Sequence, residues 1–304
     1  MKKLLGLTMI PLLALSSCTM RGPKIEEAKA KEIAASIHEY NTKQEGAEDS
    51  QSGLDYKGFD LVIATEGSSG NGADKKKESL KYKLTVNNDG EQIRFEGKGS
   101  NGTEKIDFLL IETEKEEGYE KGINYLKYYN NDTKEYEEIA VPSNVSNSVI
   151  TEYSFQMLVP AFMLAKFQDP QILMTKLDDE GKENDNYLFD YDDEEIEKDS
   201  EEKWEFYSNG DGNLTIVASS EYKGDKTTFE SETSIKTSYE IAYNKSIIKS
   251  VKAVGKSNLG NESKITMNVY ARKEPFKIEL PTGWEKKVLP ESSIPLTSSA
   301  ALFF

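Results

Sequence analysis

The sequence has very little of the side-chain chemistry on which metal sites and disulfides depend. It contains one cysteine, Cys18, and one histidine, His38, in 304 residues. A single cysteine excludes an intrachain disulfide and a cysteine-based zinc site, and one histidine leaves no imidazole pair for a metal. His38 lies in a charged stretch that reads as a helix, where the ordinary role is a solvated or half-buried side chain. We therefore predict no metal site and no cofactor.

The recurrent motifs of catalysis are missing as well. The sequence has no Gly-x-Ser-x-Gly and no His-Glu-x-x-His, and the glycine-rich residues 67–72 precede no helical pattern, so they do not form a phosphate loop. Carboxylates are abundant, and a glycosidase needs only two of them. Nothing in the sequence, however, places a pair beside buried aromatic surface. We predict no catalytic residue and a protein that is not an enzyme.

Basic residues are much fewer than acidic residues. Lys and Arg number 38 against 54 Asp and Glu, which gives a formal net charge of −16. Phosphates and anionic headgroups repel such a body, so nucleic acid is not an expected partner and any membrane attachment must be covalent or hydrophobic. Hydrophobic residues still make up 37% of the chain, with 16 Tyr and 12 Phe, which suits a β-rich core.

Strongly apolar runs are confined to two places, of which the first is the N-terminal leader. Lys2 and Lys3 precede an apolar segment, residues 4–13, that is too short to span a bilayer and is typical of a secretory signal. The following Leu15-Ser16-Ser17-Cys18 resembles the lipobox of bacterial lipoproteins. An ordinary signal peptide that contains a cysteine is the alternative, but it would leave an unpaired thiol in an oxidising compartment.

The lipobox resemblance implies cleavage between Ser17 and Cys18, with a diacylglycerol on the sulfur and a further acyl chain, such as palmitate, on the amine. Two or more chains give stable anchoring. Residues 1–17 would then be the signal peptide and residues 18–24 the lipidated tether. We expect an extracytoplasmic protein held on the cell membrane, or on the outer membrane if the cell has two.

The second apolar run is Phe155–Phe167. Its spacing predicts a helix that begins near Asn147 or Ser148 and stops before Asp169-Pro170, because proline disfavours helix in its predecessor. It is apolar nearly all round, as in a helix buried on more than one side or facing an apolar partner. Pro160 either kinks this helix or separates two short ones.

Short strands account for most of the rest, because apolar and polar residues alternate between turns such as Asp89-Gly90. A further turn is predicted at residues 97–102. Short connections between consecutive strands indicate an antiparallel meander. The predicted strands cover residues 59–63, 80–86, 93–95, 106–111, 123–129, 136–141, 204–207, 214–222, 227–243, 247–256, 264–272 and 276–280.

The predicted fold class is mainly β (α+β): a large twisted antiparallel sheet or half-barrel, with a helix over Pro23–Tyr40 and the apolar helix on its concave face. One domain would span residues 25–285, followed by a tail, 286–304, whose apolar end packs on the body or frays. Residues 178–203 form an acidic insert. The insert meets only half of the EF-hand pattern, so we expect a solvated acidic loop rather than a calcium site.

The order of elements resembles the LolA and LppX/LprG group of lipoprotein carriers and lipid-binding lipoproteins. The residues that carry the resemblance are Tyr239–Ile248, Val251–Gly255, Met267–Tyr270 and Phe276–Pro281. It implies a half-barrel of about eleven strands whose apolar hollow takes a lipid or another apolar ligand. The implied lining residues are Leu80, Tyr82, Leu84, Ile93, Phe95, Ile106, Phe108, Phe155, Leu158, Phe162 and Phe167.

Two kinds of function stay open at this point. A cavity lined by these residues favours a membrane-anchored binding protein for a lipid or other apolar molecule. A filled core with an exposed aromatic patch favours a structural or protein-interaction module of the cell envelope, with a protein as its partner.

Overall fold

The computed structural model describes most of the chain after the leader. The described residues are 21–45, 56–69, 76–87, 91–101, 104–116, 118–120, 122–175, 200–210, 212–224, 233–244 and 247–289. Ser17, Cys18, most of the acidic insert and most of the tail lie outside them, so the predictions made for those segments stay predictions. No helix among the described residues is long and apolar enough to cross a membrane.

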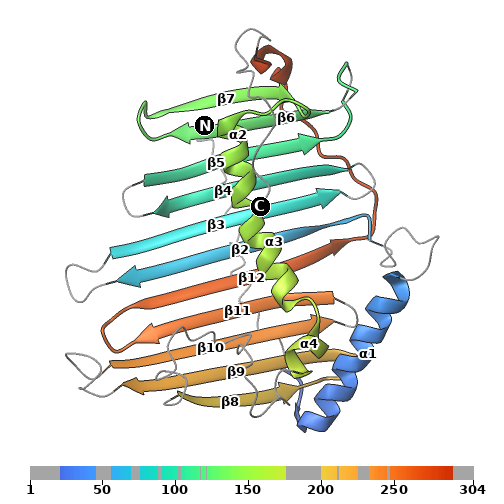
Figure 1. Ribbon diagram of the computed structural model, residues 1–304, viewed down its shortest axis with the longest axis vertical. Helices are drawn as coiled ribbons and strands as arrows, with labels where there is room; N and C mark the ends of the chain where they lie inside the picture. The colour runs from blue at the N-terminus through green and yellow to red at the C-terminus, as the bar shows by residue number, and fades with distance from the viewer. Residues whose placement is uncertain are drawn as a thin grey trace, which may run out of the picture.

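One antiparallel sheet of twelve strands forms the body, as the alternating pattern predicted (Figure 1). Its order is β1-β8-β9-β10-β11-β12-β2-β3-β4-β5-β6-β7, so β1 and β7 are its two edges and it does not close into a barrel. The strands are β1 Lys24–Ile25, β2 Gly58–Ser69, β3 Lys76–Asn87, β4 Gln92–Asn101, β5 Glu104–Thr113, β6 Ile123–Asn130, β7 Glu135–Pro142, β8 Ser200–Tyr207, β9 Asn213–Gly224, β10 Thr233–Asn244, β11 Ile247–Ser257 and β12 Glu262–Arg272.

The connectivity explains why a helical segment crosses the sheet. β2–β7 and β8–β12 are two meanders joined where β12 pairs with β2. The chain must therefore return from β7, at one edge, to β8, near the other. Ten strand spacings amount to about 48 Å, and the helical residues 148–175 span about 42 Å. The helices are thus long enough to carry most of this crossing over one face of the sheet (Figure 1).

The crossing consists of three helices, α2 Ser148–Gln156, α3 Leu158–Phe167 and α4 Pro170–Thr175. The Asn147 side chain caps α2 by accepting from the Val149 and Ile150 amides. The break falls at Met157 rather than at Pro160, since Pro160 has no N–H to donate to the Gln156 carbonyl, four residues earlier. The predicted stop before Asp169-Pro170 is confirmed, but α4 beyond it was not predicted.

The N-terminal helix, α1 Glu27–Glu45, begins four residues later than expected. Lys24 and Ile25 instead pair with Tyr207 and Phe206 of β8, whose edge would otherwise be open. The buried face of α1 consists of Ala30, Ala34 and Ile37, and the helix packs against α4, β8 and β9. The His38 imidazole lies 2.6 Å from the Asp169 carboxylate, which ties α1 to the start of α4.

Three strand predictions need correction. β4 continues through residues 97–101, where we expected a turn, and β8 begins at Ser200, inside the expected acidic insert. Phe276–Leu280 is not a strand: it runs past the ends of β3 and β4, where the Phe276 carbonyl accepts from the Asn87 amide and the Ile278 N–H donates to the Gln92 side-chain oxygen. The expected irregularity of β10 is present as a register shift between Ala242 and Tyr243.

The core lies between the helices and one face of the sheet, which we call the helix face. A second, smaller core on the opposite face surrounds Tyr125 and Trp284, which starts the 3-10 helix η2 Trp284–Lys287. The chain then runs beside β7, an edge strand of the sheet, where Val288 bridges Ala140 in parallel. Val288 belongs to this small core, whereas Leu289 donates to the Ala140 carbonyl at 3.0 Å and packs against the main core.

Candidate functional site

The predicted lining residues of the sheet share the helix face, but they form a packed interior. Phe95 is 0%, Phe108 4% and Leu84 8% exposed. The rings of Tyr82 and Phe95 stack at 5.7 Å, and Phe95 meets Phe108 edge-on at 5.1 Å. Ile93 and Ile106 pack partly buried against the same core, and Leu80 is half-buried.

Helix α2 closes this aromatic row from above. The Tyr153 ring lies 4.8 Å from Phe108 and 5.5 Å from Tyr128, measured between centroids. Burial raises the pKa of Tyr153, and burial together with the hydrogen bond donated to Glu137 raises the pKa of Tyr128 to about 12. At neutral pH both are therefore uncharged aromatic packing groups, not acid–base groups.

Three of the four helical lining predictions, Leu158, Phe162 and Phe167, concern α3, and their outcomes differ. Phe167 points inward, is 3% exposed, and its carbonyl accepts from the Tyr243 hydroxyl at 2.8 Å. Phe162 is 69% exposed. Phe155 and Leu158 are likewise 64% and 44% exposed. The prediction that Phe155, Leu158 and Phe162 point into a hollow is wrong, because the sheet-facing side of the helices is occupied by Tyr153, Met157, Leu164 and Phe167.

Four outward apolar side chains make up what we call the outer ridge: Phe155, Leu158, Phe162 and Ala165. Spacings of four and three residues place Leu158, Phe162 and Ala165 on one side of α3, and Phe155 lies at the end of α2, three residues before Leu158. All four are exposed, and no charged residue occurs from Tyr153 to Ala165. Ile172 of α4 is also 50% exposed. On a chain with a net charge of −16, this is an uncharged, apolar surface.

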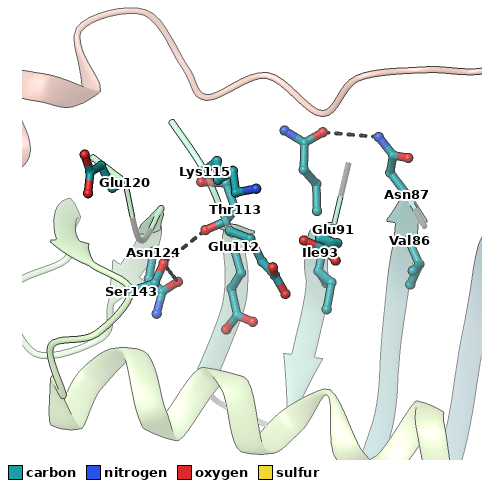
Figure 2. A pocket seen from close by; sticks show the side chains of 12 residues that line it. Val86, Asn87, Glu91, Ile93, Glu112, Thr113, Lys115, Glu120, Asn124 and Ser143 are labelled. Carbon is teal, nitrogen blue, oxygen red and sulfur yellow. Dashed lines mark hydrogen bonds between the residues drawn. The ribbon is translucent and has the colours of Figure 1, made fainter. Parts of the chain in front are cut away.

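A polar pocket lies at the ends of β3–β6 (Figure 2). Its volume is about 760 Å³. The Asn87 amide donates to the Phe276 carbonyl at 2.6 Å, and Ser143 donates to Asn124 at 3.0 Å. A hydrogen bond with Glu91 raises the pKa of Glu114. The lining is Val86, Asn87, Glu91, Gln92, Ile93, Glu112, Thr113, Glu114, Lys115, Glu120, Asn124 and Ser143.

This pocket does not correspond to the predicted lipid cavity. Of the eleven predicted lining residues only Ile93 borders it, and none borders a second pocket of about 490 Å³ at the other strand ends. Its amides, hydroxyls and carboxylates suit a small polar ligand. Sequence reasoning missed it, although a signal existed: Asn87, Gln92 and Thr113 are polar residues at strand ends that turn out to be buried. Within the described residues, no group of acidic, His or Cys side chains could hold a metal ion.

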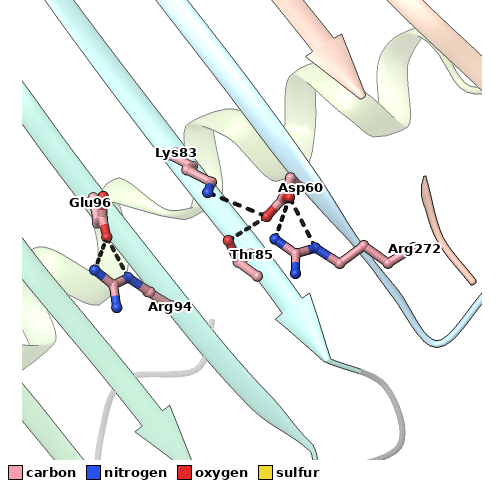
Figure 3. Close-up of polar contacts among 6 residues, drawn as sticks. All are labelled: Asp60, Lys83, Thr85, Arg94, Glu96 and Arg272. Atoms are coloured by element: carbon pink, nitrogen blue, oxygen red, sulfur yellow. Dashed lines mark hydrogen bonds and ion pairs between the residues drawn. The ribbon is translucent and has the colours of Figure 1, made fainter. Parts of the chain in front are cut away.

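The opposite face of the sheet carries ion pairs rather than a site (Figure 3). Asp60 accepts from the Thr85 hydroxyl at 2.6 Å and from two nitrogens of Arg272 at 2.6 and 3.0 Å. Burial alone would raise the pKa of Asp60, but these hydrogen bonds and the nearby Lys83 outweigh it and hold the pKa below its usual value. Arg94 pairs with Glu96 on the same face. Each of these charged side chains thus has a partner of opposite charge on the same face.

Comparison with known proteins identifies no family. The sequence matches no family model and no curated protein. It is similar to a solved DUF1329 family protein from Desulfovibrio piger at 10% identity, over 88% of this chain and 98% of that one, with a TM-score of 0.21. A β-barrel-like DUF1849 protein from Brucella abortus shares 9% identity over 72% and 97% of the two chains, with a TM-score of 0.15. Both scores are low, so neither likeness supports a conclusion about this chain, and the resemblance to the LolA and LppX/LprG group stays a prediction.

Proposed function

We propose that this protein is a non-catalytic, lipid-anchored binding protein of the cell envelope, and that it takes an apolar ligand on its outer ridge. The observation that carries the proposal is the exposure of Phe155, Leu158 and Phe162, at 64, 44 and 69%. A set of exposed apolar side chains on a protein surface usually marks a site of contact with another molecule. The ligand class is a lipid or another molecule with an aliphatic or aromatic body.

The packed interior is the reason for placing the ligand outside. The sheet residues beneath α2 are buried against one another and against Tyr153, with ring centroids 4.8–5.7 Å apart. An acyl chain could enter there only by separating the helix from the sheet. The alternative function, a protein-interaction module of the envelope, shares the same surface and differs in the chemistry of the partner.

The start of the described chain supports a position close to the membrane. Arg21 pairs with Glu240 at 2.5 Å, and its guanidinium lies 5.5 Å from the centre of the Tyr207 ring. Only three peptide links separate Arg21 from Cys18, so their Cα atoms are at most about 11 Å apart. A diacylglycerol on Cys18 would therefore keep this end of the body at the bilayer surface.

Native mass spectrometry of the chain purified without its leader, followed by titration with a fluorescent fatty acid, tests the ligand class. We expect the wild type to carry or bind the apolar ligand and the double variant Phe155→Ser/Phe162→Ser to lose it. Leu259→Ser is the matched control, because Leu259 is also apolar and 46% exposed but lies in the turn between β11 and β12. A clean unliganded mass, together with no binding of the fatty acid by the wild type, would contradict the proposal and favour a protein partner.

A further inference from the structure

The described chain ends beside β7, the edge strand of the sheet that lies nearer to α2. Val288 still packs in the small core on the far face, whereas Leu289 packs against the main core on the helix face. The Leu289 amide is held by the Ala140 carbonyl of β7 at 3.0 Å. Val288 bridges Ala140 of β7 in parallel, and the Val288 and Leu289 side chains face opposite ways because the segment is extended along this edge. The described chain thus ends beside β7, within two strands of β5 and β6, over which α2 lies.

The residues that follow have the composition of a ridge-binding segment. The tail, residues 290–304, contains one charged residue, Glu291, and ends in Ala-Ala-Leu-Phe-Phe. A nearly uncharged segment meets no repulsion from a body with a net charge of −16. Its aromatic and aliphatic end matches the ridge, which is itself built of Phe, Leu and Ala side chains.

We infer that the tail docks its apolar end, residues 300–304, on the outer ridge and covers it in competition with the ligand. This inference rests on the proposed function of the ridge, and it names the intramolecular occupant that regulates access to it.

Reach and local concentration make this docking feasible. Twelve peptide links separate Leu289 from Ala301, so their Cα atoms are at most about 40 Å apart. The start of the ridge belongs to α2, which contacts β5 and β6, so it lies about two strand spacings, or 10 Å, from β7 in the plane of the sheet. Attachment through a linker of this length gives an effective concentration in the millimolar range. A contact of only millimolar intrinsic affinity would therefore cover the ridge for a large part of the time.

Other occupants of the ridge are less well supported. A second copy of the chain would bring two bodies of net charge −16 together. An anionic membrane surface is disfavoured by the same charge. The tail is already attached, begins beside β7 close to α2, and has the complementary composition.

Disulfide trapping in the full chain tests the inference directly. Glu152 is an exposed residue of α2 one turn before Phe155, at the end of the ridge nearer to β7, so Glu152→Cys combined with Ala301→Cys offers a pair that should join under mild oxidation. The control combines Ala301→Cys with Lys98→Cys, because Lys98 is exposed and its neighbours in the ladder, Lys81 and Asp107, place it on the opposite face. Tryptic mass mapping identifies which thiols have joined and distinguishes a bond to Cys18.

We expect an intramolecular bond between residues 152 and 301 and none between 98 and 301. Failure to form the bond, a bond to Cys18 instead, or a bond between two copies would overturn the inference, the last in favour of a second copy as occupant. None of these outcomes bears on whether Phe155→Ser/Phe162→Ser abolishes binding of the fatty acid. The fatty-acid titration therefore tests the proposed function independently of the disulfide trapping.

A second measurement follows from the competition. A tail that covers the ridge for two-thirds of the time weakens ligand binding about threefold. Phe303→Ser/Phe304→Ser in the full chain should restore that factor in the fatty-acid titration. An unchanged affinity for the fatty acid in this variant would show that the tail and the ligand do not compete, and would overturn the inference.

Discussion

The ring of Phe108 on β5 lies directly over Gly97 on β4. A Cβ atom built on Gly97 would stand 2.1 Å from Cε1 of that ring, closer than any real contact. Phe108 is 4% exposed and takes part in the aromatic row beneath α2. The missing side chain of one strand thus provides the space for the aromatic side chain of the next.

Gly97→Ala should therefore destabilise the fold, because Phe108 has to move and the rings packed around it have to follow. We expect a loss of about 1–3 kcal/mol in the free energy of unfolding, measured by urea denaturation. Gly67→Ala is the matched control on β2, since the nearest atom to its built Cβ is 4.0 Å away. That variant should be neutral or slightly more stable. Equal losses at both positions would contradict this account of Gly97.

A second prediction compares two phenylalanines of α3. Phe167→Ala should cost about 3–5 kcal/mol in the free energy of unfolding, because the side chain is 3% exposed in the main core. Phe162→Ala should stay within about 0.5 kcal/mol, because its side chain is 69% exposed. Thermal or urea denaturation of the two variants measures the contrast. A large loss for Phe162→Ala would mean that the ridge is structural.

The predictable part of the fold was that governed by local periodicity. Alternation along β3 and β5 located the strands, and the Asp169-Pro170 pair located the end of α3. Two features depended on contacts that no local pattern contains. Gly97 reads as a turn residue until the ring of Phe108 is known to need its space, and Phe276–Leu280 alternates like a strand although the sheet edges lie elsewhere.

The site was less predictable for a related reason. A helix that is apolar all round indicates two apolar neighbours, but not which residues face which neighbour. The orientation is set by Tyr153 of α2, which packs between Phe108 and Tyr128 and turns Phe155 and Leu158 outward. Periodicity alone does not give that rotation, so the three exposed residues were predicted to point inward.

A third prediction concerns Asp60, whose side chain is 14% exposed on the opposite face. Asp60→Asn removes the charge that Arg272 and Thr85 bind and should cost about 1–3 kcal/mol at pH 7. Because the folded state lowers the pKa of Asp60, its contribution is present above the unfolded pKa and is lost as pH falls through the folded value. In urea denaturation, the difference between wild type and variant should therefore shrink as the pH is lowered below the ordinary carboxyl pKa of 3.8.

Glu96→Gln is the control for Asp60. Glu96 pairs with Arg94 on the same face, but the side chains are 36% and 41% exposed, so solvent screens the pair. We expect a change below about 1 kcal/mol at either pH. A pH-independent cost of Asp60→Asn would show that shape rather than charge is lost.

The last prediction concerns the titration of two tyrosines at alkaline pH. Burial raises the pKa of Tyr125 and of Tyr128 to about 12, with additional contributions from Glu138 and Glu137. A folded-state pKa above the unfolded value near 10 means that the phenols stabilise the fold fully below pH 10 and lose that contribution as pH rises towards 12. Absorbance at 295 nm should accordingly show a late phase, from which Tyr128→Phe removes one tyrosine. Glu137→Gln should lower the pKa of Tyr128 only part of the way from about 12 towards 10, because burial, the largest contribution, remains. A pKa of Tyr128 that returned to 10 in this variant would show that the hydrogen bond alone raises it.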